Sequence, residues 1–279
     1  MTATASLAAS TPAGQPVGIF DSGIGGLSVV RHIRAQLPQE NLLYFADSGF
    51  APYGDKTDKF VIERSLAIAD FLLAAGCKAL VIACNTATAS AVHLLRERYP
   101  QLPIVGIEPG LKPAAAVTRT RTVGVMATDR TLSSPKFQLL HQQLTLSTGV
   151  RFVTQACSGL ADLIEEGELE SEKTVALVQR YVSALVAERA DTLVLGCTHY
   201  PFVQSVIESA ARKAGADSIH VVDTGIAVAR QLTRLLDHNG IRRDEAEGTL
   251  EAFTSGDAAA LSRRFDRLLH ISSPVREIV

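Results

Sequence analysis

Hydrophobic and polar residues alternate along the chain in two kinds of block. Short, continuous apolar runs such as VGIF at 17–20 and ALVIAC at 79–84 are typical of strands that are buried on both faces. Longer stretches with helical spacing lie between these runs, among them residues 56–75 and 87–98. Strands that alternate with helices in this way predict an α/β fold built on parallel sheets.

This pattern starts again near the middle of the chain. TVGVMATDRT at 122–131 matches PVGIFDSGIG at 16–25, and each holds Val-Gly followed by two hydrophobic residues. A second cysteine-tipped strand, TLVLGC at 192–197, follows this restart at nearly the spacing of the first. Such self-similarity predicts two similar α/β domains with parallel central sheets and a cleft between them. We expect a disordered leader at 1–16, a first domain at 17–111 plus 223–279, and a second domain at 112–222.

The ends of the predicted strands carry polar side chains. In open parallel sheets, ligands bind beyond the carboxyl ends of the strands. If the two halves face each other, the residues at these ends share one cleft. They are Asp21, Asp47, Cys84, Thr128, Cys197 and Asp223.

Composition narrows the possible partners and compartment. The formal net charge is −2 and no polybasic run occurs, which predicts no nucleic-acid partner. The start, MTATASLAASTPAGQP, lacks both the basic residues and the apolar core of a signal peptide. No apolar run approaches the roughly 20 residues that span a bilayer, so we expect no membrane association. We therefore expect a cytoplasmic protein whose four cysteines stay reduced.

Two of the cysteines carry the chemical interpretation. A cysteine that ends a buried strand is usually a small apolar filler. Cys84, however, opens CNTAT, where a helix N-terminus can lower a thiol pKa, and Cys197 repeats this arrangement in CTHYP. Two cysteines at equivalent strand ends predict a functional pair. We expect Cys77 to be structural. Cys157 is interpreted as a strand-end residue, and no chemistry is assigned to it.

His199 and Asp21 are the polar residues nearest to these strand ends. His199 is either a satisfied core histidine or, two residues after Cys197, a group that tunes proton transfer. Zinc is the competing interpretation, but the chain offers no close second ligand pair, so we expect no metal. Asp21 either caps the following helix or contacts a substrate or a thiol. The PYG segment at 52–54 is an ordinary turn or contributes a phenol and a backbone N–H.

The DSGIGG turn is similar to a phosphate-binding loop but departs from it in detail. Gly23, Gly25 and Ser28 do not complete the dinucleotide fingerprint, and Asp21 would place a carboxylate beside a pyrophosphate. The glycines indicate instead a turn whose backbone closely approaches a small ligand.

Taken together, these segments resemble the glutamate racemases of the cofactor-independent aspartate/glutamate racemase family. The resemblance extends from Val17 to about Arg234. It rests on VGIFDSGIGGLSVVRHI, YFADSGFAPYGDK, VIACNTATA, VGIEPGLKPA, VGVMAT and LVLGCTHYPF. It implies two α/β domains with the active site between them. One departure is the segment 48–51, Ser-Gly-Phe-Ala, where the family more often has Thr-Ala.

The resemblance also implies residue roles. Cys84 and Cys197 would be the opposed catalytic acid and base, assisted by Asp21 and His199, with Cys84 deprotonating D-glutamate and Cys197 L-glutamate. It further implies no cofactor, a role in supplying D-glutamate for peptidoglycan synthesis, and a homodimer. The implied substrate contacts are Asp21, Ser22, Tyr53, Gly54, Asn85, Thr86, Thr128, Thr198 and His199.

The chemistry of racemisation suits two thiols. One residue must remove the α-proton and another must return a proton on the opposite face, so one must be ionised and the other protonated. An unperturbed thiol pKa of about 8.5 makes both forms accessible near neutrality. The alternatives are aspartate racemase, a Cys–His acyl hydrolase, which leaves the second cysteine unexplained, and a noncatalytic two-lobed amino-acid binder.

Overall fold

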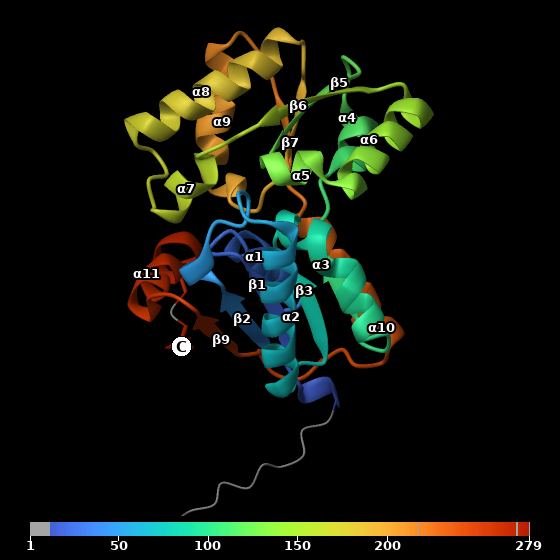
Figure 1. Ribbon diagram of the computed structural model, residues 1–279, viewed down its shortest axis with the longest axis vertical. Coiled ribbons are helices and arrows are strands. Elements are labelled where there is room, and N and C mark those ends of the chain that lie inside the picture. The colour runs from blue at the N-terminus through green and yellow to red at the C-terminus, as the bar shows by residue number, and fades with distance from the viewer. Residues whose placement is uncertain (1–11, 217, 272, 279) are drawn as a thin grey trace, which may run out of the picture.

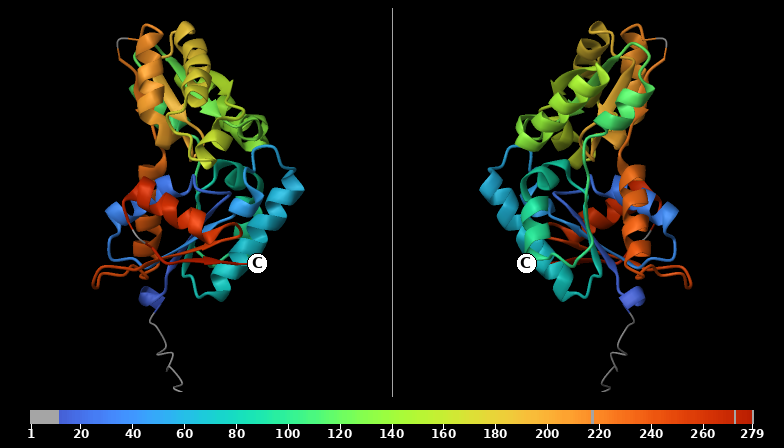
Figure 2. Two further views of the ribbon diagram at one scale, coloured as in Figure 1. Left: turned by 90° about the vertical axis from the view of Figure 1, so that its left-hand side faces the viewer. Right: turned by 90° about the vertical axis from the view of Figure 1, so that its right-hand side faces the viewer.

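The computed structural model describes residues 12–216, 218–271 and 273–278 and consists of two lobes, each built around a parallel sheet (Figures 1 and 2). The first sheet is six-stranded, in the order β10-β9-β2-β1-β3-β4, and the second is four-stranded, in the order β6-β5-β7-β8. The first sheet comprises β1 (Val17–Asp21), β2 (Leu42–Ala46), β3 (Ala79–Ile82), β4 (Ile104–Gly106), β9 (Leu250–Thr254) and β10 (Val275–Glu277). The second comprises β5 (Thr122–Ala127), β6 (Arg151–Ala156), β7 (Thr192–Leu195) and β8 (His220–Val222). All recorded strand pairs are parallel, so the predicted fold class is confirmed.

The two sheets repeat one topology. The order β2-β1-β3-β4 in the first matches β6-β5-β7-β8 in the second, with the opening strand of each half in the middle. The sequence restart at residue 122 is therefore the start of an equivalent strand. Cys84 follows β3 and Cys197 follows β7, the corresponding third strand of each half.

Helices cover both faces of the first sheet. Because successive strand residues point to opposite faces, Ile19 packs on one side and Phe20 on the other. The Ile19 side is covered by α1 (Leu27–Gln36), α10 (Gly225–His238) and α11 (Ala258–Leu269). The Phe20 side is covered by α2 (Asp58–Ala74) and α3 (Asn85–Arg98). Both predicted helices of this half are therefore confirmed, with α3 beginning two residues early because Cys84 is its N-cap.

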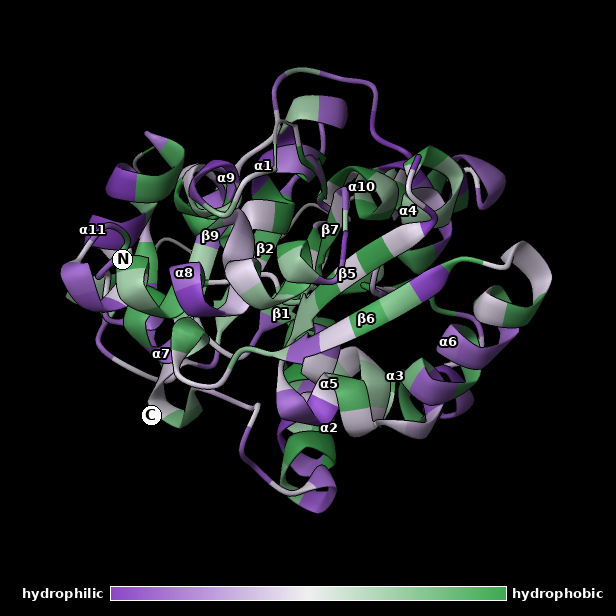
Figure 3. Ribbon diagram, turned by 90° about the horizontal axis from the view of Figure 1, so that it is seen from above, coloured by the Kyte–Doolittle hydropathy of each residue, from purple (hydrophilic) through white to green (hydrophobic). Residues whose placement is uncertain are grey.

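The second sheet is covered in the same manner. On one side lie α7 (Leu160–Glu165), α8 (Glu172–Ala187) and α9 (Gln204–Lys213), and on the other lie α4 (Leu111–Val117) and α6 (Pro135–Thr148). The short α5 (Asp129–Ser133) and the 3-10 turn η3 (Tyr200–Val203) follow β5 and β7, toward the first lobe. Figure 3 shows β5 as largely hydrophobic, whereas the edge strand β6 mixes hydrophobic and hydrophilic residues.

The structure differs from the sequence prediction near both ends of the chain. Of the expected disordered leader, residues 1–11 lie outside the described residues. Pro12–Gly14 form a 3-10 turn, η1, and the Lys78 Nζ donates to the carbonyl of Ala13 at 2.6 Å. At the other end, β9, α11 and β10 were not predicted. The two strands extend the first sheet beyond β2, and α11 packs on one face of it. Among the described residues, no helix is both long and apolar enough to span a bilayer.

Candidate active site

A small cavity lies between the two lobes, where the carboxyl ends of their strands face each other. It holds about 20 Å³ of space, roughly enough for one water molecule. A ligand larger than a water molecule therefore fits only if this cavity widens. The cavity is lined by Ser22, Pro52, Tyr53, Gly54, Cys84, Asn85, Thr86, Thr128, Thr131, Ala161, Gly196, Cys197, Thr198 and His199. Apart from Asp21, every catalytic or substrate-contact residue that the family resemblance implied lines this cavity.

Cys84 reaches the cavity from the N-terminus of α3. Its Sγ accepts a hydrogen bond from the Ala87 N–H at 3.4 Å and lies 3.8 Å from Ser22 Oγ. Burial nevertheless raises the pKa of this thiol to about 11, and the nearby Asp21 and Cys197 also raise it. The helix N-terminus does lower the Cys84 pKa through the Ala87 N–H, as expected, but desolvation outweighs this donor and the net shift is upward. In the free protein at neutral pH, Cys84 carries its proton.

Asp21 lies behind the cavity wall, not on its surface. Its carboxylate is fully buried and accepts hydrogen bonds from the Gly26 N–H at 2.7 Å and from the Tyr44 hydroxyl at 2.5 Å. Burial raises its pKa to about 7, although His199 and the two hydrogen bonds act in the opposite direction. Asp21 is thus a group that gains and loses a proton near neutrality, in electrostatic contact with both His199 and Cys84.

Cys197 stands beside a histidine–carboxylate pair. The His199 Nδ1 lies 3.6 Å from Cys197 Sγ, and its Nε2 lies 2.8 Å from Glu165 Oε2. Burial lowers the pKa of His199, but hydrogen bonds to Cys197 and Glu165 outweigh it and raise the pKa well above the usual value. The imidazole is therefore an imidazolium, which donates one ring hydrogen to Glu165 and points the other at the sulfur.

Glu165 is the functional residue that the sequence analysis missed. It ends α7, and its carboxylate accepts from the Ile24 N–H at 3.0 Å and pairs with Arg264 of α11 at 3.3 Å. Burial acts to raise its pKa, but His199 and the other donors lower it overall, so Glu165 is ionised. It lies 34 residues from His199 in a run of acidic residues, EEGE, which offered no local signal.

The remaining wall of the cavity is rich in hydrogen-bonding groups. The Asn85 side chain is 5% exposed, and neither its Nδ2 nor its Oδ1 has a partner within the described residues. Thr86 Oγ1 and Thr128 Oγ1, from opposite lobes, lie 3.3 Å apart. Leaving a buried polar group unpaired costs free energy, so the unpaired Asn85 amide in this wall indicates that the cavity binds a polar ligand.

Besides Asp21, two further strand-end residues do not line the cavity. Asp47 is fully buried and binds the Tyr53 hydroxyl, Arg64 Nη2 at 2.6 Å and Ser255 Oγ at 2.7 Å. Asp223 bonds His32 Nε2 at 2.9 Å and the N–H of Gly225. Asp47 thereby holds the phenol of a cavity residue, and Asp223 ties α1 to the start of α10. The expectation that both share the cleft is wrong, because their carboxylates turn instead to donors from other segments, Arg64 and Ser255 for Asp47 and His32 for Asp223.

Cys77 and Cys157 have separate surroundings. Cys77 packs in the core beside α2, where burial raises its pKa to about 12. Cys157 lies against a side cavity of about 230 Å³, and burial raises its pKa as well. Within the described part of the chain, no three His, Cys, Asp or Glu side chains lie close enough together to hold a metal ion.

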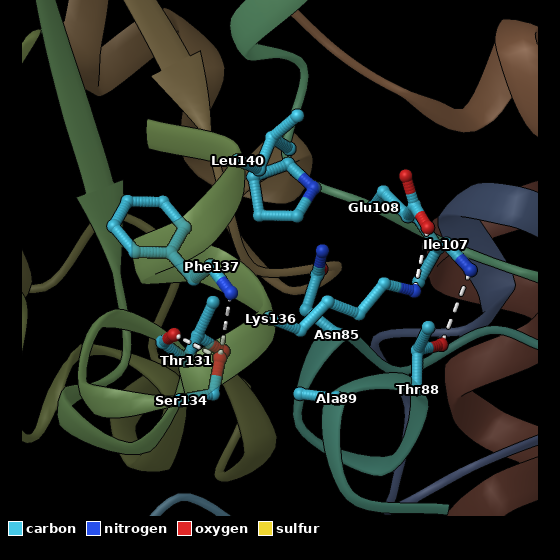
Figure 4. Close-up of a pocket in the computed structure, with 11 residues that line it drawn as sticks. Asn85, Thr88, Ala89, Ile107, Glu108, Thr131, Ser134, Lys136, Phe137 and Leu140 are labelled. Atoms are coloured by element: carbon cyan, nitrogen blue, oxygen red, sulfur yellow. Dashed lines mark hydrogen bonds and ion pairs between the residues drawn. The ribbon is translucent and has the colours of Figure 1, made fainter. Parts of the chain in front are cut away.

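A second small pocket shares Asn85 and Thr131 with the first cavity, and Figure 4 shows the residues that line it. It lies between α3, the segment after β4, and α6, where Lys136 pairs with Glu108 at 2.5 Å. Asn85 therefore borders both the cavity that holds the two cysteines and this pocket beside the connection between the lobes.

Comparison with known proteins decides the family. A model described as Asp/Glu/Hydantoin racemase matches residues 25–232. The chain belongs to this racemase family. A curated glutamate racemase from Ectopseudomonas mendocina (strain ymp) is 53% identical over 242 residues, covering 87% of this chain and 90% of that protein.

Solved structures of the family match over nearly the whole chain. The crystal structure of glutamate racemase isoform RacE1 from Bacillus anthracis has a TM-score of 0.85 and 30% identity, covering 95% of this chain and 97% of its own. A glutamate racemase from Francisella tularensis subsp. tularensis SCHU S4, in complex with D-glutamate, has a TM-score of 0.82 and 25% identity, covering 96% and 98%. The resemblance identified from the sequence motifs is thereby confirmed.

Proposed function

We propose that the protein is a glutamate racemase that interconverts L- and D-glutamate with two cysteines and no cofactor. One observation carries this: Cys84 and Cys197 leave equivalent strands of two similar sheets and line one cavity. A single-nucleophile hydrolase leaves the second thiol unexplained, and a binding protein has no need of two thiols. Relatives named glutamate racemase cover most of the chain, which favours glutamate over the aspartate alternative.

The proposed reaction moves one proton off the substrate and another onto it. With L-glutamate bound, the Cys197 thiolate takes the α-hydrogen as a proton, and the C–H electron pair stays on the α-carbon. Cys84 then gives its thiol proton to the opposite face, which yields D-glutamate, a Cys197 thiol and a Cys84 thiolate. The raised pKa of Cys84 supports this starting state, because the free protein holds a proton there.

The two thiols have different assistants. Cys197 faces the imidazolium of His199, which donates toward the sulfur and is held by Glu165. Asp21, whose pKa of about 7 lets it exchange a proton, assists the Cys84 side from behind the cavity wall. We propose that the two cysteines, His199 and Asp21 carry out the proton transfers and that Glu165 is a positioning residue.

The substrate's charged groups need donors and acceptors around the cavity. Ser22, Asn85, Thr86 and Thr198 supply hydroxyl or amide groups, and the unpaired Asn85 amide supports this assignment. Donors at the α-carboxylate stabilise the negative charge that develops when the α-proton leaves. Tyr53, Gly54, Thr128 and His199 complete the proposed contacts. The Francisella tularensis relative was solved with D-glutamate, which supports a substrate of this size.

The wider role follows from the family. We propose that the enzyme works in the cytoplasm, supplies D-glutamate for peptidoglycan synthesis and so supports cell shape. We also propose domains at 17–111 plus 223–279 and at 112–222, consistent with the two sheets. A homodimer is proposed from the family resemblance; Leu139 and Leu146, on one face of α6 and 56% and 79% exposed, are a candidate contact.

The test is optical. Purified protein without added cofactor is mixed with L-glutamate, D-glutamate or L-aspartate, and circular dichroism follows the signal over time. We expect both glutamate signals to decay to zero and the aspartate signal to persist. Cys84→Ala and Cys197→Ala should each stop the decay, whereas the control Cys77→Ala, at a buried cysteine outside the cavity, should not. Near-normal turnover by either active-site variant would contradict the two-thiol mechanism.

A further inference from the structure

The DSGIGGLS turn at 21–28 contacts the Cys197 side of the site, which the proposed function does not explain. Its backbone and one side chain meet the loop 197–199 and Glu165 of the opposite lobe. The Ser28 Oγ lies 2.9 Å from the carbonyl of Thr198, the residue between Cys197 and His199. It also lies 2.8 Å from the carbonyl of Gly25.

The glycines of the turn are closely packed against the same residues. A Cβ on Gly25 would sit 2.4 Å from His199 Nδ1, the nitrogen that faces Cys197. A Cβ on Gly23 would sit 2.4 Å from Glu165 Oε2, which already accepts from the Ile24 N–H. These positions accept no side chain because the His199–Glu165 pair occupies the space where one would be.

Building on the proposed function, we infer that Ser28 is a positioning residue that seats the Cys197–His199 loop against the first lobe. Ser28 is 1% exposed and Thr198 is 4% exposed, so water does not readily replace this bond. A hydroxyl has one hydrogen, which Ser28 shares between its own turn and the opposite lobe. The contact lies on the Cys197 side, while Cys84 is held by Ala87 and Ser22.

This one-sided placement makes a prediction that a general structural role does not. Ser28→Ala should displace the Cys197 loop slightly, and a small misplacement of a reacting group costs about tenfold or more in rate. Because the two enantiomers have equal free energy, kcat/KM must fall equally in both directions. The isotope effects should not change equally, since only the Cys197 step is slowed.

The decisive measurement is the primary isotope effect on kcat/KM with glutamate deuterated at the α-carbon. From L-glutamate, Cys197 removes the deuteron, so a slower Cys197 step makes the isotope effect larger in Ser28→Ala. From D-glutamate, Cys84 removes the deuteron and Cys197 then donates an ordinary proton. A slower Cys197 step makes the deuteron removal less rate-limiting, so the isotope effect becomes smaller and approaches one. Ser28→Thr keeps the hydroxyl and should restore the wild-type values.

The matched control is Ser65→Ala. Ser65 is a fully buried serine on α2, and its Oγ has no partner within the described residues, so this change removes a hydroxyl without touching the loop. It should leave both isotope effects unchanged. Equal changes for the two enantiomers in Ser28→Ala, or a change of the opposite sense, would overturn the inference and leave Ser28 a purely structural residue.

A second readout does not depend on turnover. Limited alkylation with iodoacetamide, quantified by peptide mass spectrometry, compares the labelling rates of Cys84 and Cys197 in the ligand-free protein. Ser28→Ala should raise the Cys197 rate severalfold and leave the Cys84 rate unchanged; an unchanged ratio would count against the inference. If the wild-type protein racemises no glutamate, the proposed function fails, and this labelling ratio alone decides the role of Ser28.

Discussion

The His199 Nε2 lies 2.8 Å from Glu165 Oε2, so a carboxylate at the end of α7 orients the imidazole whose other nitrogen faces Cys197. Both side chains are largely buried, at 4% and 14% exposure. The pair keeps an imidazolium charge beside the Cys197 sulfur, whereas the pKa of Cys84 is raised in part by Asp21, a carboxyl that titrates near neutrality. The two faces of the site are therefore electrostatically different, although the strands that carry the cysteines are equivalent.

Glu165→Gln should weaken the Cys197 side of the reaction. Removing the carboxylate charge removes one of the causes that raise the His199 pKa, so the imidazolium should lose its proton at lower pH. We expect kcat/KM to fall about tenfold or more and its alkaline limb to move to lower pH. Nuclear magnetic resonance of the histidine ring and a pH–rate profile measure the two effects.

The control for this change is Glu166→Gln, at the exposed neighbouring residue. It should leave both the His199 titration and the rate profile unchanged. An unaltered His199 pKa in Glu165→Gln would show that Glu165 does not set the charge of the imidazole.

Asp21→Asn should change the pH dependence of stability. The Asp21 pKa is raised to about 7 in the folded state from 3.8, so between these values the folded protein holds a proton that the unfolded chain has lost. This contribution to stability is fully present below about pH 4 and is lost as the pH rises through about 7. The whole loss is on the order of 4 kcal/mol.

Asparagine does not titrate, so the free energy of unfolding of Asp21→Asn should decline less than that of the wild type between pH 5 and pH 8. Urea unfolding at both pH values measures the difference. Asp266→Asn, at an exposed aspartate, should behave like the wild type. Parallel profiles for Asp21→Asn and the wild type would show that Asp21 is ionised throughout.

The serine variants should separate the two half-reactions. Serine keeps the shape of each site but is a far poorer base than a thiolate. A glutamate analogue with a leaving group on the β-carbon needs only one proton abstraction before elimination. We expect Cys84→Ser to process mainly the L-configured analogue, through Cys197, and Cys197→Ser mainly the D-configured one. The same enantiomer preference in both variants would contradict an arrangement with one cysteine on each face of the substrate.

Activity should survive removal of metals and small molecules. The proton transfers proposed here use only side chains of this chain. After dialysis against a chelator, racemisation should retain its full rate, and the absorbance spectrum should lack a band from a bound aldehyde cofactor. A loss of activity that added metal restores would contradict the cofactor-free mechanism.

The sequence by itself determined the strand pattern, the repeat and the two cysteine positions. These properties are local: a continuous apolar run predicts a buried strand whatever its neighbours are, and Cys84 and Cys197 each end such a run. A parallel sheet then directs these ends to the same edge, and of the strand-end residues Cys84, Thr128 and Cys197 do line the cavity. The substrate contacts Ser22, Tyr53, Gly54, Asn85, Thr86 and Thr198 were implied by the family resemblance instead. The repeat of β1 as β5 likewise reflects one local pattern used twice.

Only the tertiary structure decided how the two thiols differ. Glu165 reaches His199 from 34 residues away, and Ser28 reaches Thr198 from 170 residues away, and neither pairing leaves a periodic signal in the chain. Burial reversed the expected direction of the Cys84 pKa, because desolvation depends on every atom packed around the sulfur. The positions of Asp47 and Asp223 could not be predicted either, because they depend on contacts between distant segments. The carboxylate of Asp47 binds Arg64 and Ser255, and that of Asp223 binds His32.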